Sequence, residues 1–161
     1  MRADRLPFVA PPIEVPDRSC GFCDNWNGVV PPHGEPAVVH HDERLYVILA
    51  PSSLGGMPGH ALVIPTRHVE TFLDLTDEEA GEVAIMTKRV AGAIRDAFDP
   101  NGIHIQQHNG AAAWQTIPHV HVHIIPVMEY EDWPPKDWVA VTPSTERQQQ
   151  ARRLAAALQH I

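Results

Sequence analysis

Three histidines alternate with apolar residues in the run His-Val-His-Val-His-Ile-Ile, which covers residues 119–125. Successive side chains of a β-strand point to opposite faces, so the alternation predicts a strand over 119–126. The valines and Ile124 would face a core, and His119, His121 and His123 would line the other face. Imidazole acts as a nucleophile, transfers protons and binds metal ions near neutral pH. A row of three therefore points to chemistry on one face of this strand.

Composition indicates one globular, soluble domain. The chain has 161 residues, 43% of them hydrophobic, which is enough for a single core. No apolar run approaches the ~20 residues that cross a bilayer, and the N-terminus lacks the apolar stretch of a secretory signal. We therefore expect a cytoplasmic protein with no membrane partner. The net charge of −8 argues against a nucleic acid polymer as partner but leaves a small phosphorylated ligand open.

Five short segments have the composition and period of β-strands, and turn residues separate the first two into a hairpin. These segments lie at 37–41, 45–49, 61–64, 103–108 and 119–126. A long helix is predicted to begin at Thr76, because Thr-Asp-Glu-Glu forms a capping box there, and to end at 99–102. Thr142-Pro143 is predicted to cap a last helix, with Pro143 at its first position. Its predicted apolar stripe consists of Leu154, Leu158 and Ile161. The order of elements favours an α+β fold with an antiparallel sheet, a long central helix and a C-terminal helix.

Three interpretations of the histidine row compete. A single metal ion held by all three is disfavoured, because the outer two would lie ~13 Å apart along a strand and Zn–N bonds are ~2.1 Å long. A solvated structural strand is disfavoured because three imidazoles share one register. The loop at 109–116, Asn-Gly-Ala-Ala-Ala-Trp-Gln-Thr, favours phosphoryl or nucleotidyl transfer. Its small residues let backbone N–H groups approach a ligand, and Gln115 and Thr116 add polar side chains.

Two cysteines form the motif Cys20-Gly21-Phe22-Cys23. Without a sign of secretion, a disulfide is a weak interpretation. A thioredoxin-like pair needs a preceding strand and a helix that opens at the first cysteine, and Pro16-Asp17-Arg18-Ser19 does not predict these. Half of a zinc site is the better interpretation, and it requires two further ligands.

The sequence resembles the histidine triad (HIT) family, in particular its nucleotide-binding hydrolase branch, from about Cys20 to Pro126. The matching segments are the histidine row, Gly59-His60 followed by Ile64-Pro65 and His68, 74–79, and Asn109-Gly110 followed by Gln115-Thr116. The resemblance implies an α+β antiparallel sheet with two helices and a homodimer. It divides the chain into an N-terminal arm at 1–19, a HIT domain at 20–126, and a C-terminal segment with a helix at 127–161, which belongs to the same globular unit.

The resemblance implies a nucleotide phosphoramidase, that is, a nucleotidyl hydrolase or transferase that acts at the α-phosphate, and it favours the hydrolase over the transferase. His121 would attack phosphorus and form a covalent nucleotidyl-histidine, which splits one displacement into two. The other implied roles are Thr116 at the leaving group, Asn109, Gln115 and His123 at the phosphate, His60 in support, and Phe22 and Ser52 in the nucleoside pocket. Structural zinc would be held by Cys20, Cys23, His68 and His119, and catalysis would require no metal.

The sequence departs from the family pattern in the nucleoside pocket. Ser52 lies where many members have an aspartate that holds the ribose hydroxyls, Asn25 where an aliphatic residue is common, and Trp114 where a glycine usually precedes the glutamine. Two alternatives stay open. One is a dinucleoside polyphosphate hydrolase or phosphorylase, and the other is a nucleotide-binding or interaction protein with little turnover.

Overall fold

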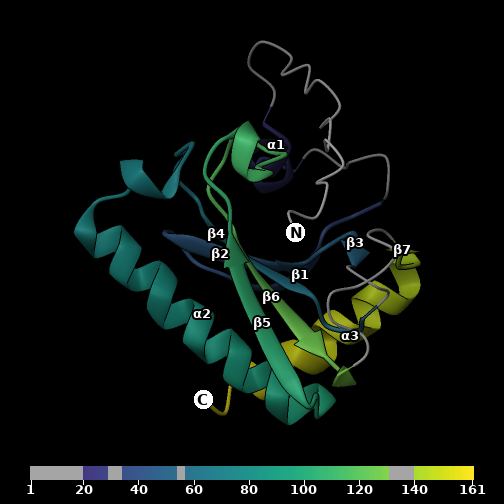
Figure 1. Cartoon of the computed structure of the whole chain (residues 1–161). Helices are drawn as coiled ribbons and strands as arrows, with labels where there is room; N and C mark the ends of the chain where they lie inside the picture. The colour runs from purple at the N-terminus through teal and green to yellow at the C-terminus, as the bar shows by residue number, and fades with distance from the viewer. Residues whose placement is uncertain (1–19, 29–33, 54–56, 131–139) are drawn as a thin grey trace, which may run out of the picture.

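A five-stranded antiparallel sheet forms the centre of the computed structural model, with helices packed against it (Figure 1). The structure describes residues 20–28, 34–53, 57–130 and 140–161, so the predicted arm at 1–19 lies outside the described residues. The predicted α+β class is confirmed.

The strands of the central sheet follow the order β1-β2-β4-β6-β5. Their bounds are β1 Ala37–His41, β2 Leu45–Leu49, β4 Ala61–Pro65, β5 Gly102–Gln107 and β6 Val122–Val127. A separate two-stranded ladder pairs β3, Ser52–Ser53, with β7, Ala140–Val141. The helices are α1 Gly21–Trp26, α2 Asp77–Phe98 and α3 Ser144–Leu158, with 3-10 turns at Phe72–Asp74 and Ala111–Ala113. Within the described ranges, no helix combines the length and apolar character that crossing a membrane requires.

The strand of the histidine row is shorter than predicted. β6 begins at Val122, so His119 and His121 precede it. The reason lies in the backbone: the His119 N–H donates to the Ile117 carbonyl at 2.8 Å, and the Val120 N–H donates to the Val69 carbonyl at 2.7 Å. Both N–H groups donate to carbonyls of loop residues rather than to a neighbouring strand. The histidine row therefore begins in a loop and ends in the sheet.

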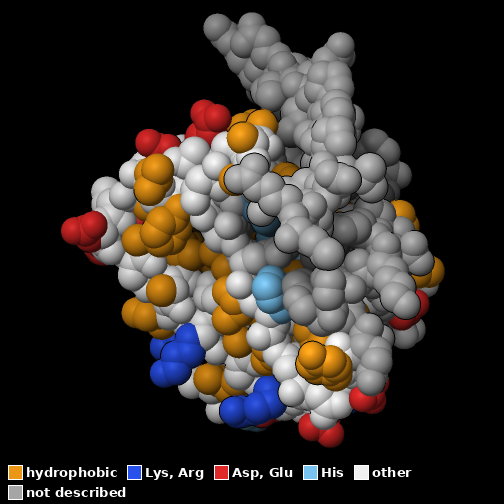
Figure 2. Space-filling model, viewed as in Figure 1, with side chains coloured by type: hydrophobic (Ala, Val, Ile, Leu, Met, Phe, Trp, Pro, Cys, Tyr) orange, Lys and Arg blue, Asp and Glu red, His pale blue; other side chains and the backbone are white. Residues whose placement is uncertain are grey.

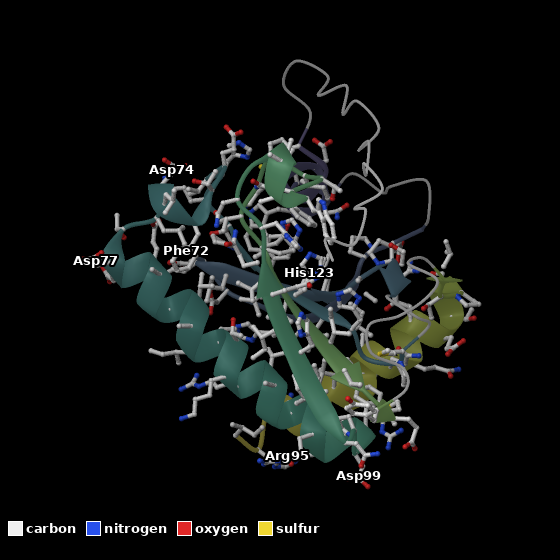
Figure 3. The ribbon with its side chains drawn as sticks, in the orientation of Figure 1. Phe72, Asp74, Asp77, Arg95, Asp99 and His123 are labelled. Atoms are coloured by element: carbon white, nitrogen blue, oxygen red, sulfur yellow. The ribbon has the colours of Figure 1, made fainter. Side chains whose placement is uncertain are left out.

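The long helix α2 begins and ends where the sequence predicts. The Thr76 hydroxyl accepts from the Glu79 N–H at 3.2 Å, while the Glu79 carboxylate accepts from the Thr76 N–H at 2.9 Å, which completes the capping box. Asp99 closes the helix in the left-handed conformation, with φ of 50°. Asp77 and Asp99 mark the two ends of α2 in Figure 3.

The last helix differs from the prediction in two details. Pro143 is the N-cap rather than the first helical residue, and α3 begins at Ser144. Leu154 is fully buried as predicted, but Ile161 is 52% exposed because the helix ends at Leu158. Arg147 and Ala151 are the other buried residues of α3.

The two faces of the sheet carry different cores. On one face, α2 and α3 bury aliphatic residues that alternate along the strands. On the other face, Phe22 of α1 packs against Tyr46, Ile48 and Ile64, and the Tyr46 hydroxyl donates to the Phe22 carbonyl at 2.9 Å. The expectation that no helix opens at Cys20 was wrong, because Cys20 is the N-cap of α1. Both cysteines are nevertheless free thiols.

Gly59 forms the turn that delivers His60 to strand β4. Its φ is +81°, and a Cβ there would lie 2.5 Å from Cε2 of Phe98. The Phe98 ring packs on the core, and the Arg153 guanidinium covers it at 5.2 Å from the centroid. The position therefore needs glycine for both its conformation and its space.

Gly59→Ala is expected to lower the free energy of unfolding by about 2–4 kcal/mol, the sum of a left-handed alanine and an overpacked ring. Gly28→Ala is the matched control, because Gly28 has φ of +80° with nothing within 4 Å of the added Cβ. It should cost only the conformational part, about 1 kcal/mol. Urea denaturation measures both, and equal losses would contradict the close approach to Phe98.

Candidate functional site

The histidine row lies near the middle of the molecule, where the label of His123 stands in Figure 3. His119 is fully buried, His121 is 5% exposed and His123 is partly buried. Figure 2 shows a histidine side chain at the centre of this face of the molecule. His121 and His123 line a pocket, whereas His119 is enclosed by protein.

The ring of His121 is held in one tautomer. Its Nδ1 lies 2.8 Å from the carbonyl oxygen of His119, and a carbonyl only accepts, so Nδ1 carries the proton. Burial lowers the pKa of His121, against the raising effect of that hydrogen bond, and His108 lowers it further. A neutral imidazole with a protonated Nδ1 presents the lone pair of Nε2, which is the reactive form of the ring.

His60 and His123 form a buried pair. Nε2 of His60 lies 3.0 Å from Nδ1 of His123, so one proton lies between the two nitrogens when both rings are neutral. Burial is the main cause that lowers the pKa of His60 to about 4 and the pKa of His123 to about 2. Proximity to His121 lowers both pKa values further. Both rings are therefore uncharged near neutral pH and act as hydrogen-bonding groups.

One pocket brings together most of the side chains that the sequence selected. Its lining includes Phe22, Ser52, His60, Thr116, His121 and His123. The Phe22 ring meets the His121 ring edge-on, with centroids 5.0 Å apart, and thereby fixes the imidazole from the side of α1. Segments that are far apart in the chain thus converge on one cavity.

Asn109 and Gln115 are not among the described residues that line this pocket. The Gln115 amide instead accepts from the Gly110 N–H and donates to the Glu70 carbonyl, each at 2.6 Å. The Asn109 carbonyl oxygen accepts from the Phe72 N–H at 2.8 Å. These two side chains therefore hold the loop backbone, and the contacts with phosphate expected for them are not prepared in this structure.

The predicted ligand set forms a compact cluster. The donor atoms of Cys20, Cys23, His68 and His119 all lie within 4.8 Å of one another. Nδ1 of His119 is 3.3 Å from the Cys20 sulfur and 3.6 Å from the Cys23 sulfur. A tetrahedral zinc ion with bonds of ~2.3 Å to sulfur and ~2.1 Å to nitrogen would separate such atoms by ~3.6 Å. The cluster thus has the donors and the spacing for one metal ion.

The surroundings of the cluster suit a metal ligand. Nε2 of His119 donates to the Pro65 carbonyl at 2.8 Å, which orients Nδ1 toward the sulfurs. Burial lowers the pKa of His119 to about 4, so the ring is neutral and able to coordinate. Burial and the neighbouring Cys20 raise the pKa of Cys23 to about 11. Two adjacent thiolates are therefore unfavourable here unless a cation lies between them.

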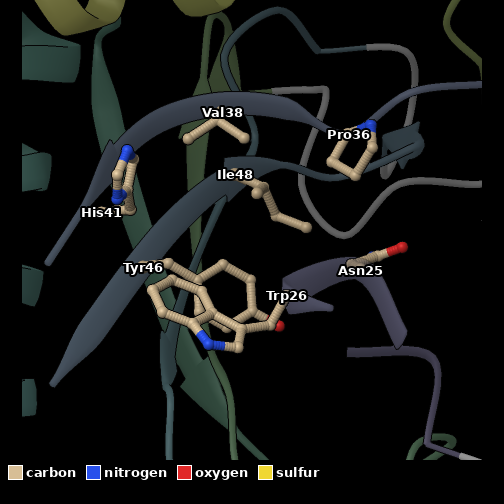
Figure 4. Close-up of a pocket in the computed structure, with 7 residues that line it drawn as sticks. All are labelled: Asn25, Trp26, Pro36, Val38, His41, Tyr46 and Ile48. Atoms are coloured by element: carbon tan, nitrogen blue, oxygen red, sulfur yellow. The ribbon is translucent and has the colours of Figure 1, made fainter. Parts of the chain in front are cut away.

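A second hollow adjoins the pocket on the outer side of α1 (Figure 4). Asn25, Pro36 and Ile48 line both hollows, so they form the wall between them. In the second hollow the ring of Trp26 lies against Tyr46, with centroids 5.5 Å apart. Asn25, which departs from the family pattern, therefore faces a mostly apolar surface that continues beyond the histidines.

Two residues near the site were not assigned a role from the sequence. The His108 ring lies 5.8 Å from the His123 ring and follows strand β5. Arg147 reaches the pocket from α3 and is only 2% exposed. The alternation around His108 indicated which face of the sheet its side chain would occupy. No local sequence pattern predicts that Arg147, on a distant helix, lines the pocket.

Fold and site together define a class of α+β proteins in which a histidine row ends in an antiparallel sheet, beside a pocket. The HIT domain model matches residues 34–129. Protein hit of Bacillus subtilis is 38% identical over 108 residues, 67% of this chain and 70% of that protein. Adenosine 5'-monophosphoramidase hnt1 of Schizosaccharomyces pombe is 36% identical over 67% of this chain and 74% of its own. The chain belongs to the HIT domain family.

Two further similarities bear on the site. The bis(5'-adenosyl)-triphosphatase of Dictyostelium discoideum is 37% identical over 75 residues, and the match spans 47% of this chain and half the length of that protein. The crystal structure of a Zn-bound histidine triad family protein from Mycobacterium smegmatis aligns with a TM-score of 0.70 and 29% identity, over 88% of this chain and 94% of that one.

Trp114 adopts a conformation that glycine favours. Its φ is 70° and ψ is 20°, in the left-handed region, and its side chain is 49% exposed. Its ring lies near His108, with centroids 6.5 Å apart, and it is not among the described residues that line the pocket. The indole thus borders the site from outside the pocket, and the backbone beneath it is strained.

The free energy of unfolding of Trp114→Gly is expected to exceed that of Trp114→Ala by about 1 kcal/mol, because only alanine is sterically strained in the left-handed region. Both variants lose the indole, so their difference isolates the backbone. Thermal and urea unfolding measure it. An alanine variant as stable as the glycine variant would contradict the left-handed conformation.

Proposed function

We propose that this chain is a hydrolase of nucleotide conjugates that acts at the α-phosphate through a covalent intermediate on His121. The observation that carries the proposal is the hydrogen bond from His121 Nδ1 to the His119 carbonyl, 2.8 Å long, inside a pocket. It keeps the Nε2 lone pair available for attack without a separate base to remove a proton.

In the first step, Nε2 of His121 attacks the α-phosphorus and a P–N bond forms. The bond from phosphorus to the leaving group breaks, and the leaving group departs with its electron pair and takes up a proton. In the second step, water attacks the same phosphorus, the P–N bond breaks, and the nucleoside monophosphate leaves. Another acceptor in place of water would make the reaction a transfer. The proton stays on Nδ1 of His121, which donates it in a hydrogen bond to the His119 carbonyl throughout.

Neighbouring groups support phosphate binding. His123 is uncharged and paired with His60, so it can donate one N–H to a phosphate oxygen while His60 fixes its ring. Thr116 lines the same pocket and offers a hydroxyl to the leaving group. We assign Asn109 and Gln115 the task of holding the loop that carries Thr116. Phe22 and Ser52 would contact the nucleoside.

The names of two relatives define the substrate candidates. An adenosine 5'-monophosphoramidase favours a nucleoside phosphoramidate, and a bis(5'-adenosyl)-triphosphatase favours a dinucleoside polyphosphate. We place the phosphoramidate first because that match covers 74% of the relative's length, against 50% for the other. A nucleotide-binding protein with little turnover is the remaining candidate, favoured only by Ser52 and Trp114.

We infer that the cluster of Cys20, Cys23, His68 and His119 is a structural zinc site. Two thiolates and two imidazoles form a closed tetrahedral set with no open position, which is the pattern of structural zinc. A Zn-bound histidine triad structure supports the choice of metal. The ion would join α1 to the loop before β6, and no metal would take part in the reaction.

We further propose a cytoplasmic homodimer whose ligand is a small nucleotide, without nucleic acid polymer or membrane as partner. Two free thiols as metal ligands suit a reducing compartment. Strand β5 is an edge of the described sheet, and its Ile105 side chain is 50% exposed. An exposed antiparallel edge of this kind can pair with a second copy.

The reaction is tested by incubating the protein with adenosine 5'-phosphoramidate and, separately, with diadenosine triphosphate. Wild type should release AMP from at least one of them. His121→Ala should lose activity by on the order of 10³-fold or more, because no other group provides the covalent route. His160→Ala, at an exposed position at the end of the chain, should be unchanged.

An alkaline quench during turnover, followed by mass spectrometry, should locate the nucleotidyl group on His121. Turnover of His121→Ala at the wild-type rate would contradict the proposal. Nucleotide binding by wild type without turnover of either substrate would favour the binding-protein alternative.

The metal site is tested by elemental analysis of the purified protein, which should give one zinc per chain. The double variant Cys20→Ser/Cys23→Ser should lose the metal, and its Tm should fall by about 10 °C or more, as a loss of a few kcal/mol produces in a chain of this size. His160→Ala should retain both. Full zinc in the double variant would contradict the four-ligand site.

A further inference from the structure

The ring of His121 cannot supply the proton that a phosphoramidate needs for its leaving group. An amine departs from phosphorus as a neutral molecule, so an acid has to protonate its nitrogen while the P–N bond of the substrate breaks. The Nδ1 proton of His121 is donated to the His119 carbonyl at 2.8 Å, and Nδ1 is not the nitrogen that attacks. The proton must therefore come from another group.

The side chains that line the pocket are poor acids for this step. Burial is the main cause that lowers the pKa of His60 to about 4 and the pKa of His123 to about 2, so both rings are neutral near pH 7. A neutral imidazole, a hydroxyl such as that of Thr116, or a guanidinium holds its protons too firmly to protonate an amine. No aspartate, glutamate or lysine is among the described residues that line the pocket.

A fourth imidazole adjoins the histidine row. His108 directly follows strand β5, and its ring meets the ring of His123 edge-on, with centroids 5.8 Å apart. The ring of His123 lies in turn 4.8 Å from the ring of His121, again between centroids. Burial is the main cause that lowers the pKa of His121, and proximity to His108 lowers it further. A charge on His108 is therefore felt at the ring of the proposed nucleophile.

His108 differs from the other imidazoles of the site in its contact with solvent. It is partly exposed, whereas His60 is 4% and His121 is 5% exposed. Its backbone carbonyl accepts a hydrogen bond from Gln107, but among the described residues none forms a hydrogen bond with its ring nitrogens. The titratable groups that face it, His121 and His123, are kept neutral by burial. The ring is therefore free to take up a proton from solvent and to release it to a ligand.

The position of His108 suits the departure of a leaving group. The attacking and leaving atoms lie roughly in line on opposite sides of phosphorus. His121 belongs to the pocket wall, so a group opposite to it points away from that wall, toward the mouth of the pocket. His108 is not among the described residues that line the pocket, yet it touches His123, which does, and it is partly exposed. These contacts place its ring at the mouth.

We propose that His108 is the general acid and base of the reaction. As an imidazolium, it donates its proton to the leaving nitrogen while the bond from phosphorus to the amine breaks and the bond from phosphorus to Nε2 of His121 forms. The neutral ring then takes a proton from the attacking water while the nucleotidyl-histidine bond breaks, which restores the imidazolium. The inference rests on the proposed function, because it assumes that the reacting phosphorus lies at His121.

Two nucleotides with the same reacting phosphorus test this role. Adenosine 5'-phosphoramidate needs a proton on its leaving group, whereas adenosine 5'-(4-nitrophenyl phosphate) releases nitrophenolate, which departs as a stable anion. With enzyme in excess, loss of the phosphoramidate and appearance of nitrophenolate each report the first step alone. His108→Ala should slow this step about 10²-fold or more with the phosphoramidate, as loss of a general acid does, and by less than about threefold with the nitrophenyl ester.

The second step gives an independent measurement. During steady turnover of the nitrophenyl ester, His108→Ala should accumulate the nucleotidyl group on His121, because the attacking water has lost its base. Mass spectrometry of the quenched protein measures this accumulation. Wild type should show less of the intermediate under the same conditions.

Two further variants accompany His108→Ala. His108→Gln keeps a polar side chain that cannot transfer a proton, so it should show the same contrast between substrates, and it carries the test if the alanine variant does not fold. His104→Ala is the matched control. It removes another partly buried histidine of β5, which lies about 13 Å away along the strand and contacts Gln106 at 3.2 Å. It should retain wild-type rates with both substrates.

A merely structural His108 would slow both substrates alike. An equal loss with both, or a wild-type rate with the phosphoramidate in both His108 variants, would overturn the assignment while turnover through His121 stands. No turnover of either substrate by wild type would overturn the proposed function, and the role of His108 with it.

Discussion

His119 is the residue on which the site depends, because each of its polar groups serves a different part of the structure. Its N–H and Nε2 donate to the carbonyls of Ile117 and Pro65, and its Nδ1 faces the two cysteine sulfurs. Its own carbonyl accepts from the ring of His121. The side chain is fully buried, so none of these groups can exchange its partner for water. His119 thus contacts, and helps to position, the end of β4, the N-terminus of α1 and the imidazole of His121.

This arrangement links the proposed metal site to the ring of His121, the proposed nucleophile. Whatever fixes the position of His119 also fixes the acceptor that selects the tautomer of His121, and the tautomer decides which nitrogen of that ring presents a lone pair. The cluster can therefore influence reactivity without supplying a Lewis acid to the substrate. Phe22 adds a second link, since its ring contacts the rings of both His119 and His121. A six-residue helix such as α1 has little stability of its own and depends on such contacts.

The sequence predicted the bounds of those helices and strands that follow from local periodicity. β1 and β2 have the predicted bounds, and α2 begins at the predicted capping box, because alternation and capping act over a few residues. The composition of the metal cluster came from the family resemblance, and its geometry agrees with that set. Helix α1 was missed because Gly21, Asp24 and Asn25 are weak helix formers, and packing rather than propensity holds it.

The remaining differences come from contacts between distant segments. The β3–β7 ladder pairs Ser52 with Val141, and no pattern within either two-residue strand specifies a partner 89 positions away. Arg147 reaches the pocket from α3, a helix that packs against α2 and β1. The side chains of Gln115 and Asn109 turned to the loop backbone, where the sequence could identify their chemistry but not their direction. Residue types were predictable, whereas orientation required the tertiary structure.

The charge of the chain sharpens the role of these local donors. A chain with net charge −8 would repel a nucleotide if its carboxylates lay near the pocket. Those of α2 lie instead on its outer surface, where Glu78 and Glu82 pair with Arg44, and Glu79 pairs with Arg67. The sheet separates them from the pocket, and exposed pairs are screened by salt. Attraction for a phosphate must then come from groups within hydrogen-bond distance. Among the described residues that line the pocket, the groups proposed for this task are the imidazole N–H of His123 and the hydroxyl of Thr116, so binding of a nucleotide would depend on contacts rather than on the overall field.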